Sequence, residues 1–309
     1  MADLRAVGLF GGRNIPADSL TVVRATVWTA LDYGRGVANS EAHRHVGIAK
    51  QLGSFQIKTL REVLGVSDST PILGVLGETG DLTDKWRGKL KQILLAQQMY
   101  LAPEESLPKE IARAALDAGG GTSLFARVNR WLSDILARPT VVSSFRKRSV
   151  LKKVVMKAAR TEWIRAVQAS ERLKDTYAPS EPLRTRGYLD VAFRGRRVLT
   201  KLRVDDLNLG AAGYKTNAPS QQRCALCNTE PETRRHFTVT CTSLSHVRER
   251  HEETMRLTCG LGLTDAFRTL ILARPPGATE NRDRAVSVGS LLHDLWDERC
   301  RLLGIRVDM

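Results

Sequence analysis

Apolar residues recur at intervals of three and four along most of this chain, which is the period of one face of an α-helix. The alternation of apolar and polar residues that marks β-strands is rare. The pattern therefore predicts a mainly α fold with a helical bundle, a long basic helix and further helices toward the carboxyl end. We expect helices over about residues 18–31, 40–64, 83–100, 143–177 and 243–257, and a last one that carries Val288, Leu291, Leu292, Leu295 and Trp296.

Residues with known preferences for helix ends mark several of these boundaries. Asp18 or Ser19 can cap the first helix, and Gly65, which tolerates a left-handed backbone, ends the second. Pro71 is expected to open the next segment, because proline is favoured at the start of a helix. Ser243 is expected to cap the helix that runs to about residue 257.

The positive charge is concentrated in one part of the chain. The 309 residues carry a net charge of +15, and residues 138–203 hold 18 basic and five acidic side chains, a net +13. No acidic residue occurs between Arg138 and Arg160. Such a concentration is typical of proteins with a phosphate-rich partner, because each neutralised phosphate releases condensed counterions. With 42% hydrophobic residues, the chain is not disordered by composition.

The helix predicted over residues 143–177 separates its apolar and basic residues. On a helical wheel Leu151 and Val155 fall on one side, and Lys153 and Lys157 fall on the other. A solvated helix surface usually interleaves glutamate with lysine, and this one does not. Two interpretations remain open: the basic face binds an anion, or it is only a soluble face.

A second basic group follows between residues 184 and 203, and Tyr188 and Phe193 lie within it. Arginine interleaved with aromatic rings can bind phosphates and stack on exposed bases, which suits structured or single-stranded RNA. The two rings could equally be anchors of the hydrophobic core. The residues predicted to bind RNA are Arg146, Lys147, Arg148, Lys152, Lys153, Lys157, Arg160, Arg184, Arg186, Arg194, Arg196, Arg197, Lys201 and Arg203.

Four residues near the carboxyl end have the spacing of a zinc site: Cys224, Cys227, His236 and Cys241. Zn²⁺ takes four thiolate or imidazole ligands tetrahedrally, and a Cys-x2-Cys turn presents two sulfur atoms from one bend of the backbone. Because all four ligands come from the protein, the predicted cofactor is a structural zinc ion in a closed site. The alternative is that these are buried thiols that lie close together by chance.

The other histidines and cysteines in this region have simpler interpretations. His246 and His251 compete for the place of the histidine ligand, but the polar face of the following helix suits them better. Cys259 and Cys300 have no neighbouring partner and are expected to be core thiols in a reduced compartment.

Most motifs that mark enzymes are missing. Nucleophile elbows, Walker loops, dinucleotide fingerprints and paired-histidine zinc protease motifs do not occur. No Gly-Lys-Ser/Thr follows Gly119-Gly120-Gly121, so this run is expected to be a flexible joint between two short helices. The adjacent acids Asp205 and Asp206 follow a basic segment and are expected at a helix end or in a loop. No run approaches the roughly 20 apolar residues of a membrane span, and no signal-peptide layout opens the chain.

Three blocks of sequence resemble one family. The first is residues 15–34, where a helix ends in Tyr33-Gly34, and the second is residues 60–80. The third is residues 199–241, which hold the cysteines and the run Glu232-Thr233-x-x-His236-Phe237. Together they are similar to the region downstream of the catalytic palm in reverse transcriptases of non-LTR (LINE-type) retrotransposons, from the thumb to the CCHC zinc knuckle.

The resemblance implies an organisation along the chain. It suggests a thumb-like helical domain over residues 1–101, a helical connector over 102–137 and a basic RNA-binding segment over 138–209. A CCHC zinc knuckle over 210–258 and a carboxy-terminal helical segment over 259–309 would follow. In this family the thumb and the basic linker hold template RNA, and the knuckle helps to hold the template or target strand.

The chain departs from the family in its catalytic parts. The palm with its paired aspartates would lie before Met1, so polymerase activity is not expected. Some relatives carry a nuclease marked by Arg-Pro-Asp, but Arg274-Pro275-Pro276 lacks the carboxylate, and Glu280 and Asp283 do not rebuild the site.

The resulting expectation is a non-catalytic RNA-binding protein that serves as a structural subunit of a ribonucleoprotein. An organellar ribosome, as in a mitochondrion, would be one such setting, with structured RNA and protein subunits as partners and no membrane. Two alternatives remain. The chain could be one piece of a split reverse transcriptase with a separate palm subunit, or it could be a remnant that binds a DNA target.

Overall fold

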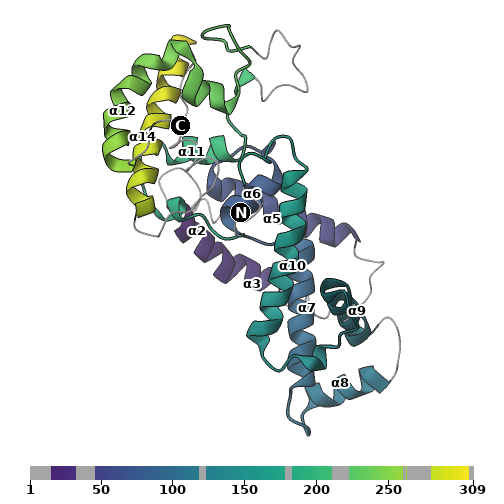
Figure 1. The fold of residues 1–309 in the computed structure, drawn as a ribbon. Helices are drawn as coiled ribbons and strands as arrows, with labels where there is room; N and C mark the ends of the chain where they lie inside the picture. Colours follow the sequence, from purple (N-terminus) through teal and green to yellow (C-terminus); the bar gives the residue numbers. More distant parts are fainter. Residues whose placement is uncertain are drawn as a thin grey trace. The chain divides into compact units, whose positions relative to one another are not determined.

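Helices dominate the computed structural model of this chain (Figure 1). Within the described residues there is no β-strand, and a single isolated bridge joins Arg223 to Pro231. The mainly α fold predicted from the hydrophobic pattern is therefore confirmed. No described helix is both long enough and apolar enough to cross a lipid bilayer. The structure describes residues 15–32, 46–117, 123–177, 183–210, 223–259, 262 and 280–305.

The described helices have the following order along the chain. The elements that begin before residue 145 are α2 (Pro16–Val23), η1 (Arg24–Trp28), α3 (Thr29–Asp32), α5 (Val46–Leu64), α6 (Ile72–Thr79), α7 (Asp84–Tyr100), α8 (Leu107–Asp117), α9 (Leu124–Leu136) and η2 (Val142–Ser144). The later ones are α10 (Arg148–Gln168), η3 (Gly187–Asp190), α11 (Arg196–Arg203), η6 (His236–Thr240), η7 (Thr242–Leu244), α12 (Ser245–Cys259) and α14 (Glu280–Leu302).

Several helix ends lie where the capping residues place them. Gly65 follows α5 with a φ of 66°, a left-handed conformation that glycine adopts without steric cost. Pro71 directly precedes α6. The hydroxyl of Thr83 accepts a hydrogen bond of 3.3 Å from the backbone N–H of Trp86 and so caps α7. Gly119-Gly120-Gly121, Tyr33-Gly34 and Arg274-Pro275-Pro276 lie outside the described residues.

The helix predicted over residues 143–177 is shorter in the structure, where α10 covers only Arg148–Gln168. The chain turns after Gln168, and the side-chain amide of Gln168 donates a 2.8 Å hydrogen bond to the carbonyl of Tyr177. Leu173 and Tyr177, which belong to this turn, are buried in the hydrophobic core. The apolar residues beyond residue 168 therefore belong to the core through a turn, and not through the face of a helix.

The chain forms two compact units, each assembled from segments that are distant in sequence. Unit 1 comprises Met1–Thr21, Ile57–Asp81 and Ala166–Met309, and unit 2 comprises Val22–Gln56 and Leu82–Arg165. In unit 2, α7, α8 and α9 pack against one another, and η2 packs against α7 and α9.

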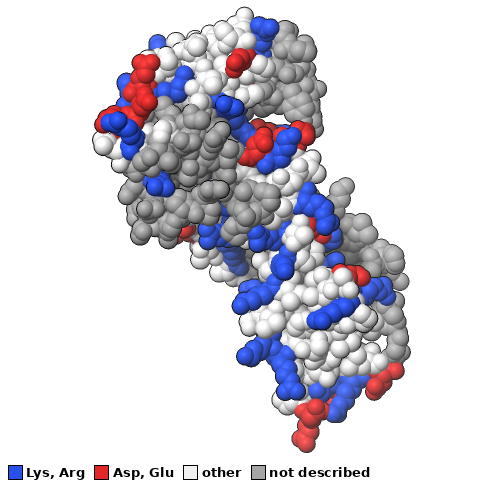
Figure 2. Space-filling model, in the orientation of Figure 1, with Lys and Arg blue, Asp and Glu red and all other residues white. Residues whose placement is uncertain are grey.

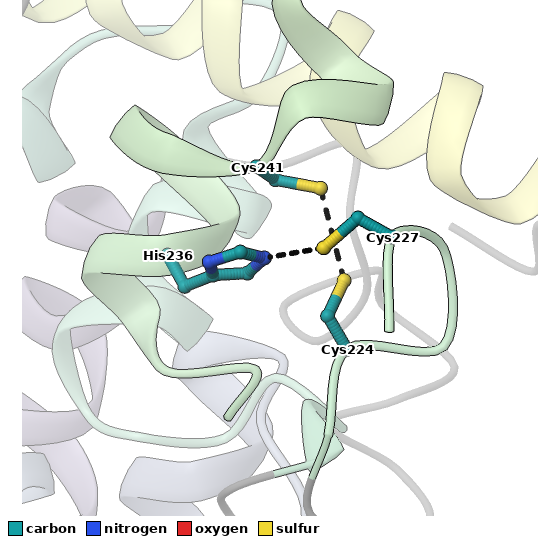
Figure 3. Close-up of side chains that lie close together, drawn as sticks. All are labelled: Cys224, Cys227, His236 and Cys241. Atoms are coloured by element: carbon teal, nitrogen blue, oxygen red, sulfur yellow. Dashed lines mark hydrogen bonds between the residues drawn. The ribbon is translucent and has the colours of Figure 1, made fainter. Parts of the chain in front are cut away.

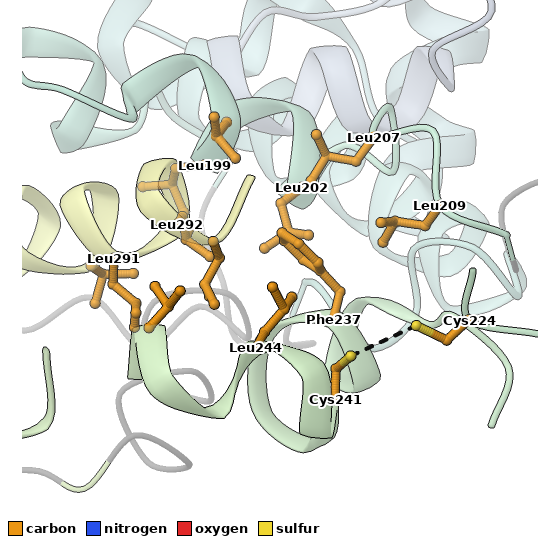
Figure 4. Packing of buried hydrophobic residues seen from close by; sticks show 14 of the residues in the cluster. Leu199, Leu202, Leu207, Leu209, Cys224, Phe237, Cys241, Leu244, Leu291 and Leu292 are labelled. Atoms are coloured by element: carbon orange, nitrogen blue, oxygen red, sulfur yellow. Dashed lines mark hydrogen bonds between the residues drawn. The ribbon is translucent and has the colours of Figure 1, made fainter. Parts of the chain in front are cut away.

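The core of unit 1 lies where α11 and α12 pack on α14 (Figure 4). The ring of Phe237 meets that of Trp296 edge to face, with centroids 6.1 Å apart. Tyr188 and Phe193 also pack against this cluster, so the core interpretation of these two rings is the one that holds. The buried members are Val198, Leu199, Leu202, Leu207, Leu209, Cys224, Phe237, Cys241, Leu244, Val247, Met255, Val288, Leu291, Leu292 and Leu295.

A buried carboxylate, that of Glu78 on α6, connects three other parts of unit 1. Glu78 is 0% exposed. It accepts hydrogen bonds from the hydroxyls of Tyr177 (2.7 Å) and Tyr188 (2.6 Å) and from Nε of Arg203 (2.9 Å). Burial alone would raise the pKa of this carboxyl, but the charges of Arg203 and Arg186 and the two hydroxyls outweigh it and hold the pKa below its usual value.

We predict that Glu78→Gln lowers the free energy of unfolding at neutral pH by about 3–5 kcal/mol, because it leaves the charge of Arg203 buried and unpaired. A carboxyl whose pKa is lowered on folding stabilises the fold above its ordinary pKa of 4.5 and loses this contribution as the pH falls below it. The variant should therefore lose less stability on acidification. Urea denaturation at neutral pH and at a pH below 4.5 measures the free energy of unfolding of variant and parent. The exposed Glu252→Gln is the control. Equal stability of variant and parent would contradict the role of Glu78.

Candidate metal centre

The four predicted ligands point toward one another in unit 1 (Figure 3). Their ligand atoms all lie within 4.8 Å of one another. Sγ of Cys224 lies 3.7 Å from Sγ of Cys241, and Sγ of Cys227 lies 3.2 Å from Nε2 of His236. Sulfur ligands at about 2.3 Å from a tetrahedral metal would be about 3.8 Å apart. The Cys224–Cys241 distance therefore fits a shared metal ion.

A tight turn presents the first two cysteines. The backbone N–H of Asn228 donates to the carbonyl of Cys224 at 2.8 Å, and Asn228 adopts a left-handed φ of 55°. The N–H of Cys224 donates to the carbonyl of Glu230 at 2.8 Å, which ties the turn to the returning chain. The Cys227 sulfur is consequently brought back toward that of Cys224.

The other two ligands lie at the two ends of η6, which is one short π-helical segment. His236 begins this segment and Cys241 directly follows it. A short helical segment thus carries this pair of ligands. Cys224, His236 and Cys241 are buried, whereas Cys227 is half-buried. The site is therefore largely closed to water, which suits a structural ion.

Two residues that sequence reasoning missed orient the histidine ring. Nδ1 of His236 lies 3.2 Å from Oε2 of Glu230 and 3.1 Å from the hydroxyl of Thr240. A proton on Nδ1 can be donated to the Glu230 carboxylate, which leaves the Nε2 lone pair for a metal. The spacing of Glu230, six residues before the histidine, carries no signal in a single sequence.

The surroundings of Cys227 and Cys241 shift the pKa values of these two thiols in opposite directions. Burial raises the pKa of Cys227, but hydrogen bonds from Thr229 and from its cluster neighbours lower that pKa to about 6. Burial and the charges of Cys224 and Cys227 raise the pKa of Cys241 to about 12. The Cys241 thiol would therefore stay protonated at neutral pH unless a cation lay among the ligand atoms. A metal ion supplies that cation, so the donor set could bind one.

The two histidines downstream do not belong to the cluster. Nε2 of His246 lies 3.1 Å from Oε1 of Glu298, and Nε2 of His251 lies 2.8 Å from Oδ2 of Asp294. Both partners are on α14, so these side chains link α12 to α14. Cys300 is buried, as expected. The side chain of Cys259 is not among those that the structure describes.

A second group on α14, formed by His293, Asp294 and Asp297, also has metal-ligating chemistry. The guanidinium of Arg194 lies 3.3 Å from Asp294 and 3.4 Å from Asp297. The guanidinium of Arg194 therefore already forms ion pairs with both carboxylates of this group.

The first group of predicted RNA-binding residues lies mostly on the surface of α10. In Figure 2 a run of lysine and arginine side chains follows the part of the surface that α10 occupies in Figure 1. Leu151, Val155 and Ala159 are buried on its other face. Arg160 is half-buried. The exposed members are Arg146, Lys147, Arg148, Lys152, Lys153 and Lys157.

The second predicted group is divided by the structure. Arg186 and Arg203 are buried near Glu78, so they serve the interior of unit 1 and are removed from the RNA-facing set. The physical reason is that a buried carboxylate requires an opposite charge. Arg184 and Arg194 are exposed. Those that are half-buried are Arg196, Arg197 and Lys201.

Asp205 and Asp206 lie just past the end of α11, as predicted. Asp205 pairs with Arg172 at 2.5 Å, and Asp206 accepts a hydrogen bond of 2.6 Å from the hydroxyl of Thr70 and a further one from Ser67. These contacts use both carboxylates to hold α11 and the turn before α6 in unit 1.

No family model, curated protein or solved structure matches the chain.

Replacing one ligand should abolish metal binding. We expect Cys241→Ser to release the metal and to raise hydrogen exchange in residues 224–241 and in α14, because Cys241 belongs to the core that packs on α14. Elemental analysis and hydrogen-exchange mass spectrometry measure these effects. Cys300→Ser, a buried thiol outside the cluster, is the control. Metal retained by Cys241→Ser would contradict the assignment of this ligand.

Proposed function

We propose that this chain is an RNA-binding protein that uses the basic surface of α10 and has no catalytic centre of its own. In this proposal a structural zinc ion in the Cys224–Cys227–His236–Cys241 site stabilises unit 1. The resemblance to reverse transcriptases of non-LTR retrotransposons further suggests descent from such an enzyme. It also suggests that the chain serves as a structural subunit of a ribonucleoprotein.

The observation that carries the proposal is the uncompensated charge of residues 146–157. Six basic side chains are exposed here, and no carboxylate in the described part of the chain forms an ion pair with any of the six. Among other exposed bases, Arg113, Lys174 and Arg256 each have a carboxylate partner, whereas Arg235 and Arg250 have none within the described residues, but neither of these two lies in a run of several exposed basic residues. Mutual repulsion along α10 costs stability, and phosphate groups would remove that cost.

The preference for RNA over other polyanions comes from the resemblance. Because Tyr188 and Phe193 pack in the core, base stacking on these rings does not contribute. The α10 surface therefore offers phosphate contacts in the main, and these bind without reading sequence. Such contacts suit a protein that holds structured RNA in place within an assembly.

Zinc is the metal that best fits the donor set. Three thiolates and one imidazole are soft and borderline ligands, and Zn²⁺ binds them tetrahedrally without preferring another geometry. All four positions of the ion would be filled by protein, which leaves none for a catalytic water. Arg172, Ser67 and Thr70 hold the carboxylates of Asp205 and Asp206, which supports a structural role for this pair too.

We predict that replacing Arg146, Lys152, Lys153 and Lys157 together by glutamine weakens binding to structured RNA by at least tenfold at moderate salt. The magnitude of the slope of log affinity against log salt should fall by up to about 3–4, because each lost phosphate contact contributes about 0.7 in single strands and about 0.9 in a B-form duplex. Fluorescence anisotropy over a salt series measures both quantities.

The control removes the same net charge from other exposed positions, by replacing Arg113, Lys174, Arg256 and Arg301 with glutamine. It should change RNA affinity much less. Equal effects of the two sets would mean that only the total charge matters. Tighter binding to duplex DNA than to RNA at the same salt would favour a DNA-binding remnant, and a co-purifying palm subunit with primer-extension activity would favour a split reverse transcriptase.

A further inference from the structure

Arg248 on α12 is a buried cation with no anion of its own. Only 8% of this residue is exposed. It forms no ion pair within the described residues, and its Nη1 is buried without a hydrogen-bond partner. Its Nη2 donates to the backbone carbonyl of Cys241, which is one of the four cluster residues. A guanidinium buried in this way costs several kcal/mol unless an opposite charge lies nearby.

The other charged groups around the cluster are already compensated or in solvent. Arg299 forms a buried pair with Glu232, with Nε–Oε1 at 2.6 Å and Nη2–Oε2 at 2.9 Å. The carboxylate of Glu230, which contacts His236, is 64% exposed and therefore screened by water. Arg235 and Glu249 are exposed as well, and Glu249, which follows Arg248 in sequence, forms no ion pair with it. Arg248 is thus the buried charge near the cluster that the described residues leave unbalanced.

The metal-bound cluster would supply the missing anion. A divalent ion with three thiolates and one neutral imidazole carries a net charge of −1. Burial lowers the pKa of Arg248, and the charges of Cys241 and of its sequence neighbour Glu249 act in the opposite direction. The buried +1 of Arg248 and the buried −1 of the cluster would then neutralise each other.

We infer that Arg248 is the counter-charge of the metal centre, a positioning residue that tunes the affinity for a divalent ion. This inference rests on the proposed zinc occupancy of the site. It adds a charge balance that the four ligands do not provide, and a hydrogen bond that fixes the backbone of Cys241. Sequence reasoning missed Arg248 because a lone arginine on a polar helix has no distinguishing pattern.

The experiment measures zinc affinity by competition with a chelator in the full chain. Arg248→Gln keeps a hydrogen-bond donor but loses the charge, and we expect about a 10–100-fold loss of affinity. Arg248→Lys keeps the charge and should recover most of that loss. Arg250→Gln, an exposed arginine on the same helix, is the matched control and should be within about twofold of the parent.

A double-mutant cycle separates charge balance from simple folding effects. Cys227→His gives a centre with two thiolates and two imidazoles, which is neutral with a divalent ion. In that background Arg248→Gln should cost less than about threefold in zinc affinity. Any cost to folding from the loss of Arg248 is common to both backgrounds and cancels. Replacing zinc by Co²⁺ gives absorption bands from thiolate-to-metal charge transfer, and these bands report the ligand set in each protein.

Three results would overturn the inference. One is an unchanged zinc affinity in Arg248→Gln with lower stability, which would make Arg248 only a cap of η6. Another is an equal loss in the glutamine and lysine variants, and the third is an equal loss in the two cysteine backgrounds. If the parent protein takes up no zinc at all, the proposed metal centre itself fails, which is a separate result from these three.

Discussion

A buried charge needs an opposite charge beside it, and this constraint organises unit 1. Glu78 is balanced by Arg203 and two tyrosine hydroxyls, and Glu232 by Arg299. Each pair joins segments more than 60 residues apart, so charge balance also fixes the topology. Because separating either pair would leave an ion in a low-dielectric core, these contacts hold α6 to α11 and α14 to the segment before η6.

Two groups of cations lack such balance, and the functional account rests on them. On α10 and just before it, six basic side chains of residues 146–157 face solvent without carboxylate partners in the described part of the chain, which we attribute to RNA phosphates. At the cysteine cluster Arg248 is buried without an anion, which we attribute to a metal–thiolate centre. A positive charge can be balanced by a carboxylate of the chain or by a bound ligand, and the same electrostatic rule applies to both. Where the chain supplies no carboxylate, we therefore infer that the ligand is an anion or an anionic centre.

The sequence predicted those features that depend on local spacing. Helix ends at Gly65, Pro71 and Thr83, the buried face of α10 and the convergence of the four metal ligands all follow from periodicity or short motifs. It could not predict long-range pairing. Arg186 and Arg203 belong to a basic run, and only the fold shows that they serve Glu78. The two compact units could not be predicted for the same reason, because each one combines stretches of chain that are distant in sequence.

The central claim, that the exposed face of α10 contacts RNA, is tested most directly by ultraviolet crosslinking of the protein to the nucleic acid that co-purifies with it. Mass spectrometry then identifies the crosslinked peptides, and sequencing identifies the nucleic acid. Our account predicts ribonucleotide adducts on peptides from residues 146–157. Adducts confined to other segments, adducts of deoxyribonucleotides, or none on these peptides would contradict it.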